Sequence, residues 1–130
     1  MSEYTQTLSG IVYPDFRVTF NVASGVTEND IGKAVVQDTS AAGTVKLGTA
    51  GDMILGRLFA LEDRTAQGGG LVGTVELKGG MKLPYTTGQT IAVGDQVVCD
   101  AGGLVKKGDG EGLLVWEVDT VAKTVTVLIV

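Results

Sequence analysis

The sequence predicts an all-β protein, a small barrel or sandwich of short strands punctuated by glycine, with an extended N-terminal arm. Three observations lead to this class. Glycine supplies 20 of the 130 residues and proline only 2, so the glycines mark turns and not a disordered tract. Short runs rich in valine, leucine and isoleucine recur between these turns, as strands do. No long stretch keeps the 3.6-residue period of an amphipathic helix.

The C-terminal third shows this pattern most clearly. Residues 112–118 and 124–130 are two β-rich runs separated by a five-residue turn, a spacing typical of a β-hairpin. The final run, rich in valine, is expected to pair inside a sheet. Trp116 shares its strand face with Leu114 and Val118, and we expect it to lie in the core more readily than at an interface.

Two sequence patterns occur twice in the same order. Residues 32–38 and 94–100 share G-x-x-V-V-x-D, and residues 43–48 and 103–108 share G-x-V-K-x-G. Both copies place a glycine before two valines, a turn after them and a short return run. This order predicts a repeated β-hairpin. Chance reuse of turn chemistry in a small all-β protein is the alternative.

The segment between the copies adds further strands. Residues 53–61 are apolar on both faces apart from Arg57, a polar loop follows over 62–70, and 71–77 return as a strand. Thr27, followed three residues later by Asp30, resembles a capping box and predicts a single helical turn. The whole pattern predicts eight to ten short strands in the barrel or sandwich, which occupies residues 25–130.

Residues 1–24 form a distinct unit, an extended arm with a first strand. Apolar residues alternate with polar ones from residue 16 to residue 22, so one face of this strand is apolar. The strand packs either on the protein's own core or on a neighbouring subunit or partner by strand addition. Because aromatic residues and arginine are enriched at interfaces, the candidate anchors of the arm are Tyr4, Tyr13, Phe16, Arg17 and Phe20.

Composition limits the partners. The net charge is −5, which argues against nucleic acid, since phosphate binding requires clustered lysine and arginine. The mean hydropathy of +0.27 is high for an acidic protein and suggests contacts between subunits. A single cysteine forms no disulfide within the chain. With no signal-peptide pattern and no apolar run long enough for a membrane span, we expect a soluble protein made in a cytoplasm, without a membrane partner.

The sequence predicts no enzyme, no cofactor and no metal site. Histidine is absent, and with it the commonest general base and metal ligand. Cys99 lies in an apolar strand pattern and is interpreted as a buried structural thiol. Gly68–Gly70 lacks the lysine and helix of a phosphate-binding loop. Around Lys82, the residues 80–83 resemble the hairpin on which biotinyl and lipoyl domains carry their cofactor, but the lead-in and spacing differ.

From Val26 to Val130 the pattern resembles the small capsid decoration, or cement, proteins of tailed bacteriophages. The order of motifs carries the resemblance more than any single motif. The segments that match, in this order, are residues 30–35, 54–58, 72–79, 91–98, 103–105 and 112–115, followed by the valine-rich final strand.

This resemblance implies a non-enzymatic protein of the virion, bound to the outside of an icosahedral head. Its partners would be the major capsid protein and copies of itself, as a homotrimer or a dimer. The arm residues would contact the capsid. A second candidate contact, between subunits, is formed by Met81, Leu83, Pro84 and Tyr85, with a sheet-edge turn as the alternative for that segment.

Two other functions fit a small β-module. A tail-tube or baseplate component would assemble into stacked rings. A carbohydrate-binding domain would expose clustered tryptophan and tyrosine platforms, and one tryptophan with three scattered tyrosines argues against it.

Overall fold

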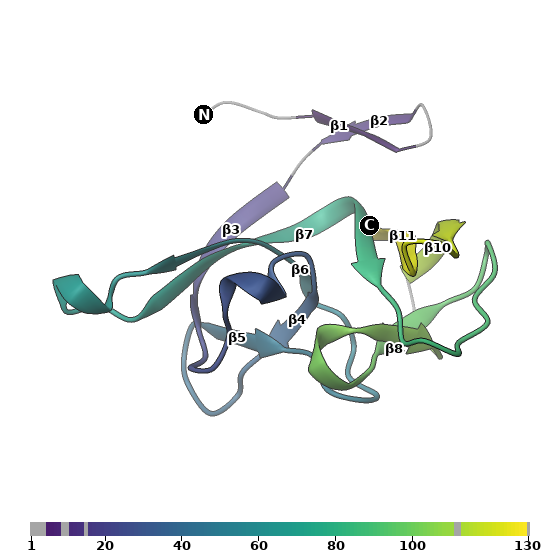
Figure 1. Cartoon of the computed structure of the whole chain (residues 1–130). Coiled ribbons are helices and arrows are strands. Elements are labelled where there is room, and N and C mark those ends of the chain that lie inside the picture. Colours follow the sequence, from purple (N-terminus) through teal and green to yellow (C-terminus); the bar gives the residue numbers. More distant parts are fainter. Residues whose placement is uncertain (1–4, 9–10, 15, 111–112, 130) are drawn as a thin grey trace.

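The computed structural model describes residues 5–8, 11–14, 16–110 and 113–129, and places β-strands over most of them. The prediction of an all-β fold is confirmed. Eleven strands and three one-turn 3₁₀ helices lie in these ranges (Figure 1). The strands are β1 (Thr5–Leu8), β2 (Ile11–Pro14), β3 (Phe16–Val22), β4 (Ala34–Gln37), β5 (Thr44–Leu47), β6 (Gly56–Asp63), β7 (Leu71–Pro84), β8 (Val97–Cys99), β9 (Val105–Lys107), β10 (Leu113–Asp119) and β11 (Thr124–Ile129); the helices are η1 (Glu28–Asp30), η2 (Thr65–Gln67) and η3 (Ala101–Gly103).

Five strand segments close a first small barrel. The first half of β7 pairs with β3, β3 pairs in parallel with β5, β5 pairs with β4, and β4 pairs with β6. Strand β6 then pairs back onto β7, so the sheet returns to the strand where it began. Valine and leucine side chains fill the inside, as expected for a barrel of this size. They are Val22, Val26, Val35, Val45, Leu58 and Val75.

A second barrel is closed by the rest of the chain. The second half of β7 pairs with β11, and β11 pairs with β10. A bridge between Gln96 and Leu114 connects β10 to the β8–β9 hairpin, and a parallel bridge between Tyr85 and Val105 connects β9 to β7. The interior includes Tyr85, Val97, Val105, Val115 and Val127.

The two barrels have the same strand pairing, residue by residue. Val35 and Val36 pair with Leu47 and Lys46, just as Val97 and Val98 pair with Lys107 and Lys106. The sequence repeat therefore corresponds to two hairpins of identical register.

The equivalence extends well beyond the motifs that the sequence repeats. The Gly32 amide donates to the Leu58 carbonyl, as the Gly94 amide donates to the Val115 carbonyl. In each barrel the register shifts at the next residue, so that Phe59 in β6 and Trp116 in β10 are equivalent bulge residues. We conclude that β3 through the first half of β7 and the second half of β7 through β11 are two structural repeats.

Strand β7 belongs to both repeats. Val75, in its first half, lies in the first core, and Met81 and Leu83, in its second half, lie in the second core. At the junction Gly79 has a φ of 95°, which disfavours any residue with a Cβ. Glycine at this position lets one strand pass from one barrel to the next.

Strand β4 joins the two interiors because its side chains alternate between them. Val35 points into the first core, whereas Ala34 and Val36 pack with residues of the second. Below β7 in Figure 1, the β4–β5 and β8–β9 regions lie side by side. Hydrogen bonds link them, including one from the Gly103 amide to the Gly48 carbonyl.

The N-terminal arm forms a separate two-stranded sheet, β1 with β2, drawn above the barrels in Figure 1. Strand β1 passes close to β7 of the main sheet without pairing with it. Strand β3, which falls within the predicted arm of residues 1–24, is a wall of the first barrel. Its packing matches the first of the two alternatives for this strand, burial on the protein's own core.

Candidate interaction surface

The outer surface of the first barrel carries a charged row across three strands. Arg17 on β3 and Arg57 on β6 both lie opposite Glu76 of β7. The Arg57 Nη1 donates to Glu76 Oε1 at 2.7 Å, and the Glu76 side chain is only 4% exposed. The Arg17 guanidinium lies 3.7 Å from the centre of the Phe59 ring. The aromatic residue of the first bulge is therefore covered by a cation of the same chain.

The second barrel has an apolar row at the equivalent positions. Gly80, Leu128 and Leu114 lie opposite one another across β7, β11 and β10. Leu114 is 45% exposed and Trp116, the bulge residue, is 40% exposed. Leucine thus replaces both members of the Arg57–Glu76 pair, and glycine replaces Arg17.

A second pair of equivalent positions is also exposed and apolar. Ile31 and Val93 each precede the turn glycine whose amide donates to β6 or β10, and both are exposed. Each repeat therefore presents an aliphatic residue and an aromatic residue near the equivalent hydrogen bond.

The expectation that Trp116 lies in the core is wrong. Leu113 and Val115 are the buried residues of β10, and the register shift leaves Trp116 outside.

The predicted arm residues divide into three groups. Phe16 and Arg17 are exposed at the start of β3, with Lys78 Nζ 5.8 Å from the centre of the Phe16 ring. Phe20 is half-buried and packs against the first core, so it contributes to the packing of the barrel. Tyr4 lies outside the described residues. The backbone of Tyr13 pairs with Gln6 in the arm hairpin, and its side chain is outside the described part.

The predicted subunit contact over residues 81–85 lies inside the chain. Met81, Leu83 and Tyr85 are buried in the second core, and Pro84 is half-buried at the end of β7. This placement corrects the expectation that these side chains face another subunit. The glycines before them and the proline among them resemble a turn in sequence, yet the segment continues a strand of 14 residues.

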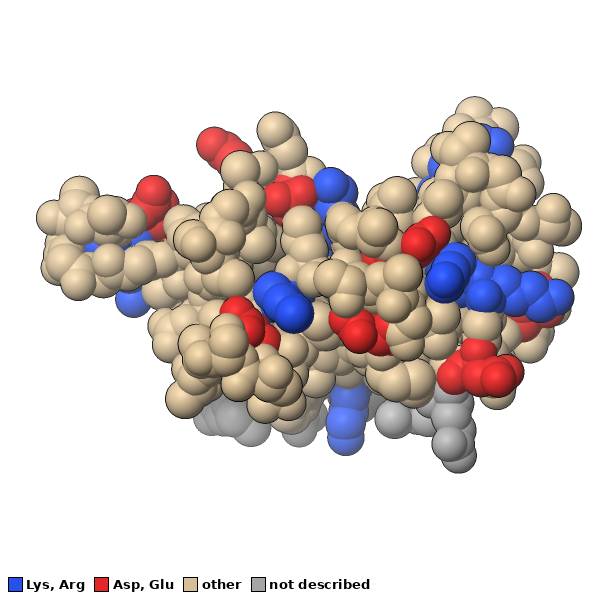
Figure 2. All heavy atoms as spheres, turned by 90° about the horizontal axis from the view of Figure 1, so that it is seen from below, with Lys and Arg blue, Asp and Glu red and all other residues tan. Residues whose placement is uncertain are grey.

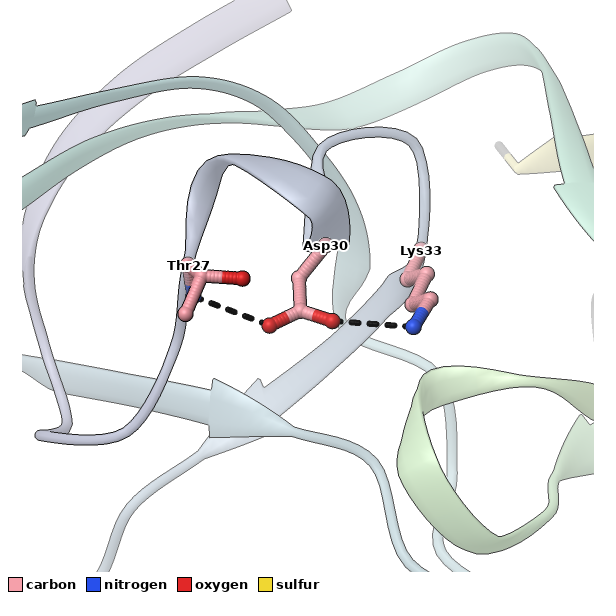
Figure 3. Close-up of polar contacts among 3 residues, drawn as sticks. All are labelled: Thr27, Asp30 and Lys33. Atoms are coloured by element: carbon pink, nitrogen blue, oxygen red, sulfur yellow. Dashed lines mark hydrogen bonds and ion pairs between the residues drawn. The ribbon is translucent and has the colours of Figure 1, made fainter.

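The turn before β4 is held by one carboxylate (Figure 3). Asp30 accepts a hydrogen bond from the Thr27 amide at 2.9 Å and another from Lys33 Nζ at 2.8 Å. These bonds hold the pKa of Asp30 below its ordinary value, and the bond from Lys33 has the larger effect. The predicted single helical turn is present as η1. This acid is a structural cap and not a free functional group.

Cys99 is fully buried. Its side chain belongs to the second core and lies beside Gly48. Burial, and to a lesser degree the Asp52 carboxylate, raises the pKa of the thiol to about 12. The thiol therefore remains protonated at neutral pH and is a poor nucleophile. Among the described residues, no group of three or more acidic or cysteine side chains is arranged to hold a metal ion.

Charge is dispersed over the face opposite the arm. In Figure 2, most charged side chains are scattered singly or in mixed groups among uncharged residues, and the basic side chains that adjoin one another at the right form only a short stretch. Such a surface offers no broad basic track for a phosphate backbone. No helix in the described ranges has the length and apolar character that crossing a bilayer requires.

Comparison with protein-family models, with curated proteins and with solved structures finds no match to this chain.

Proposed function

We propose that this protein is a structural component of a tailed-bacteriophage virion, which binds the outside of the head and stabilises contacts between major capsid subunits. The order of sequence motifs supports this proposal, as does an all-β fold that exposes apolar and aromatic side chains on both repeats. Exposed groups of this kind are typical of interaction sites.

The arm hairpin is the observation that carries the proposal. Strands β1 and β2 pair with each other and, within the described ranges, with no strand of either barrel. A two-stranded hairpin is marginally stable by itself in water, and its outer edges have unpaired amides and carbonyls. A neighbouring capsid strand would satisfy these groups by strand addition. The arm would then hold the two barrels on the outer surface of the capsid.

Association of copies would strengthen such binding. A single arm supplies only a few backbone hydrogen bonds, whereas a trimer binds through three arms at once. Linking these contacts raises the effective concentration of the second and third. The proposal therefore includes self-association, with the homotrimer as the expected state and the dimer as the alternative.

Co-sedimentation with expanded heads tests the proposal. The heads would be assembled from the major capsid protein encoded in the same genome. The full chain should sediment with them, and a variant that lacks residues 1–15 should not, although its circular dichroism and unfolding midpoint remain close to those of the full chain. A truncated protein that still decorates heads would remove the arm from the mechanism.

A more conservative variant separates strand addition from other effects of truncation. Thr7 and Val12 are register partners in the hairpin, and proline at both positions removes their amides from pairing. This variant should lose head binding while its barrels remain folded. Val121 is 93% exposed in the β10–β11 turn, and its replacement by serine is the matched control. Full-length protein that ignores heads and assembles into rings by light scattering would favour a tube component instead.

A further inference from the structure

The two repeats differ at one chemically informative place, the bulge where Phe59 and Trp116 lie. In the first repeat, Arg17 covers the Phe59 ring at 3.7 Å, and Glu76 lies opposite Arg17 in the register. In the second repeat, Gly80 is at the position of Arg17, and it contributes no side chain. The first repeat thus has an aromatic ring, an arginine and a carboxylate, and the second has the aromatic ring without the arginine.

A carboxylate is also present in the second repeat, at a neighbouring position. Glu117 follows Trp116 in the bulge, and the register shift there leaves both residues exposed. Glu117 forms no ion pair with any described residue. Leu114, on the same outer face of β10, adds exposed apolar surface beside the ring. An indole face, an aliphatic surface and an unpaired carboxylate together complement a guanidinium on its aliphatic stem.

We propose that the surface formed by Leu114, Trp116 and Glu117 docks an arginine side chain of a partner protein. The guanidinium would stack on the Trp116 indole as that of Arg17 stacks on Phe59, and it would pair with the Glu117 carboxylate. If the proposed function holds, the partner is the capsid protein and this surface is a second contact, separate from the arm.

The arginine comes from another protein because those of this chain are engaged. The sequence has three arginines. Arg17 stacks on Phe59, Arg57 pairs with Glu76, and Arg64 pairs with Glu62 at 3.0 Å. Of these pairs, the one between Arg64 and Glu62 is exposed, so Arg64 could exchange its partner for the surface of a second copy. The test must therefore distinguish docking of Arg64 from a second copy and docking of an arginine from another protein.

The single tryptophan of the chain reports on this surface directly. The probe is the peptide acetyl-Leu-Arg-Leu-amide, titrated into the full-length protein while the emission of Trp116 is recorded. We expect a saturable change with half-saturation on the order of millimolar, as for one exposed cation–π contact and one exposed ion pair. The peptide with citrulline in place of arginine keeps the shape and removes the charge, and it should bind about 3- to 10-fold more weakly.

Matched variants assign the response to the named groups. Glu117→Gln should weaken binding of the arginine peptide about 2- to 5-fold and leave binding of the citrulline peptide unchanged. Glu28→Gln, an exposed acid on η1, should change neither. No emission change at about 10 mM peptide, or an equal response to the citrulline peptide, would overturn the assignment. A change in emission with protein concentration alone, accompanied by larger particles in light scattering, would assign the surface to a second copy and overturn the partner assignment.

Binding to heads then tests the capsid as the source of the arginine. If the full chain does not sediment with heads, the proposed function fails, while the peptide titration still decides the chemistry of this surface. If the full chain binds, Trp116→Ala should weaken binding and Glu28→Gln should not. Equal binding by wild type and Trp116→Ala would show that the capsid does not occupy this surface, and would overturn the capsid part of the inference.

Discussion

Arg57 donates a hydrogen bond to Glu76 across the β6–β7 pair, and the second barrel has Leu114 and Leu128 at the same two positions. The same backbone arrangement thus accommodates either an ion pair with one nearly buried partner or two leucines. Replacing a buried pair by apolar residues is often neutral, whereas removing one partner is costly. The second barrel therefore shows which residues, two leucines, can replace Arg57 and Glu76 in the first barrel.

This comparison gives the first prediction. Arg57→Leu alone should lower the free energy of unfolding by about 1–3 kcal/mol, because Glu76 then loses its 2.7 Å partner in a buried position. The double variant with Glu76→Leu should recover most of that loss. Guanidinium denaturation followed by circular dichroism measures both. A double variant less stable than Arg57→Leu would contradict the equivalence of the two rows.

Close backbone approach gives the second prediction. A Cβ atom at Gly56 would overlap the Glu76 carbonyl oxygen and lie 2.8 Å from Val75 Cγ1. Gly56→Ala should therefore destabilise the fold by about 1–3 kcal/mol, as overpacking does. Gly70→Ala is the control, since a Cβ there meets no other atom within 4 Å, and its unfolding midpoint should hardly change. Equal midpoints for the two variants would show that β6 can move away from β7.

The buried thiol predicts a loss of stability at alkaline pH. The folded-state pKa of Cys99 is raised to about 12, from an ordinary value of 9.0. Because the unfolded chain releases this proton first, the contribution of Cys99 is complete below pH 9. It then falls by about 1.4 kcal/mol per pH unit as the pH rises towards 12. The difference in unfolding free energy between wild type and Cys99→Ala should follow this course. A constant difference from pH 8 to pH 11 would contradict it.

The cap before β4 predicts the opposite dependence at acid pH. The pKa of Asp30 is lowered by the hydrogen bonds from Lys33 and the Thr27 amide. Its contribution is therefore present above the ordinary carboxyl pKa of 3.8, and it is lost as the pH falls through the lower folded-state value. Asp30→Asn should cost about 1 kcal/mol at pH 7 and little at pH 2. Thermal melts at the two pH values measure this difference, and an equal cost at both would assign it to packing.

The shared strand predicts one unfolding transition. Val75→Ala changes the first core and Val127→Ala the second, and Trp116 emission reports from the second. Because β7 completes both barrels, Val75→Ala should shift the Trp116 transition by about as much as the transition followed by circular dichroism. Both variants should lose about 1–3 kcal/mol. Two separated transitions in either variant would show that the barrels unfold independently.

The sequence predicted the fold class and the repeated hairpin because both depend on local signals. Glycine and valine determine the turns and strands of the β4–β5 and β8–β9 hairpins, and these residues recur in both copies. The rest of the repeat was hidden because equivalent strand positions differ in residue type. Val18 and Met81 hold the same place, as do Arg57 and Leu114, and only the pairing register reveals it.

The candidate surface was less predictable for a related reason. Strict alternation along β10 groups Trp116 with Leu114 and Val118, and no residue in the sequence marks the bulge that displaces it. Gly79 and Gly80 resemble a turn, although they lie inside β7. Nothing in the sequence distinguishes Ile31, Phe59 and Val93 from core residues, since exposed apolar residues are recognisable only once the core is known.

Strand β7 is the last strand of one repeat and the first strand of the next, so each repeat after the first adds four strands to the polypeptide. A longer relative built on the same plan would make β11 the next common strand. Its β11 would need a second half to begin the next barrel, as β7 has, and a cut between the two halves of such a strand would leave each barrel with all of its strand segments.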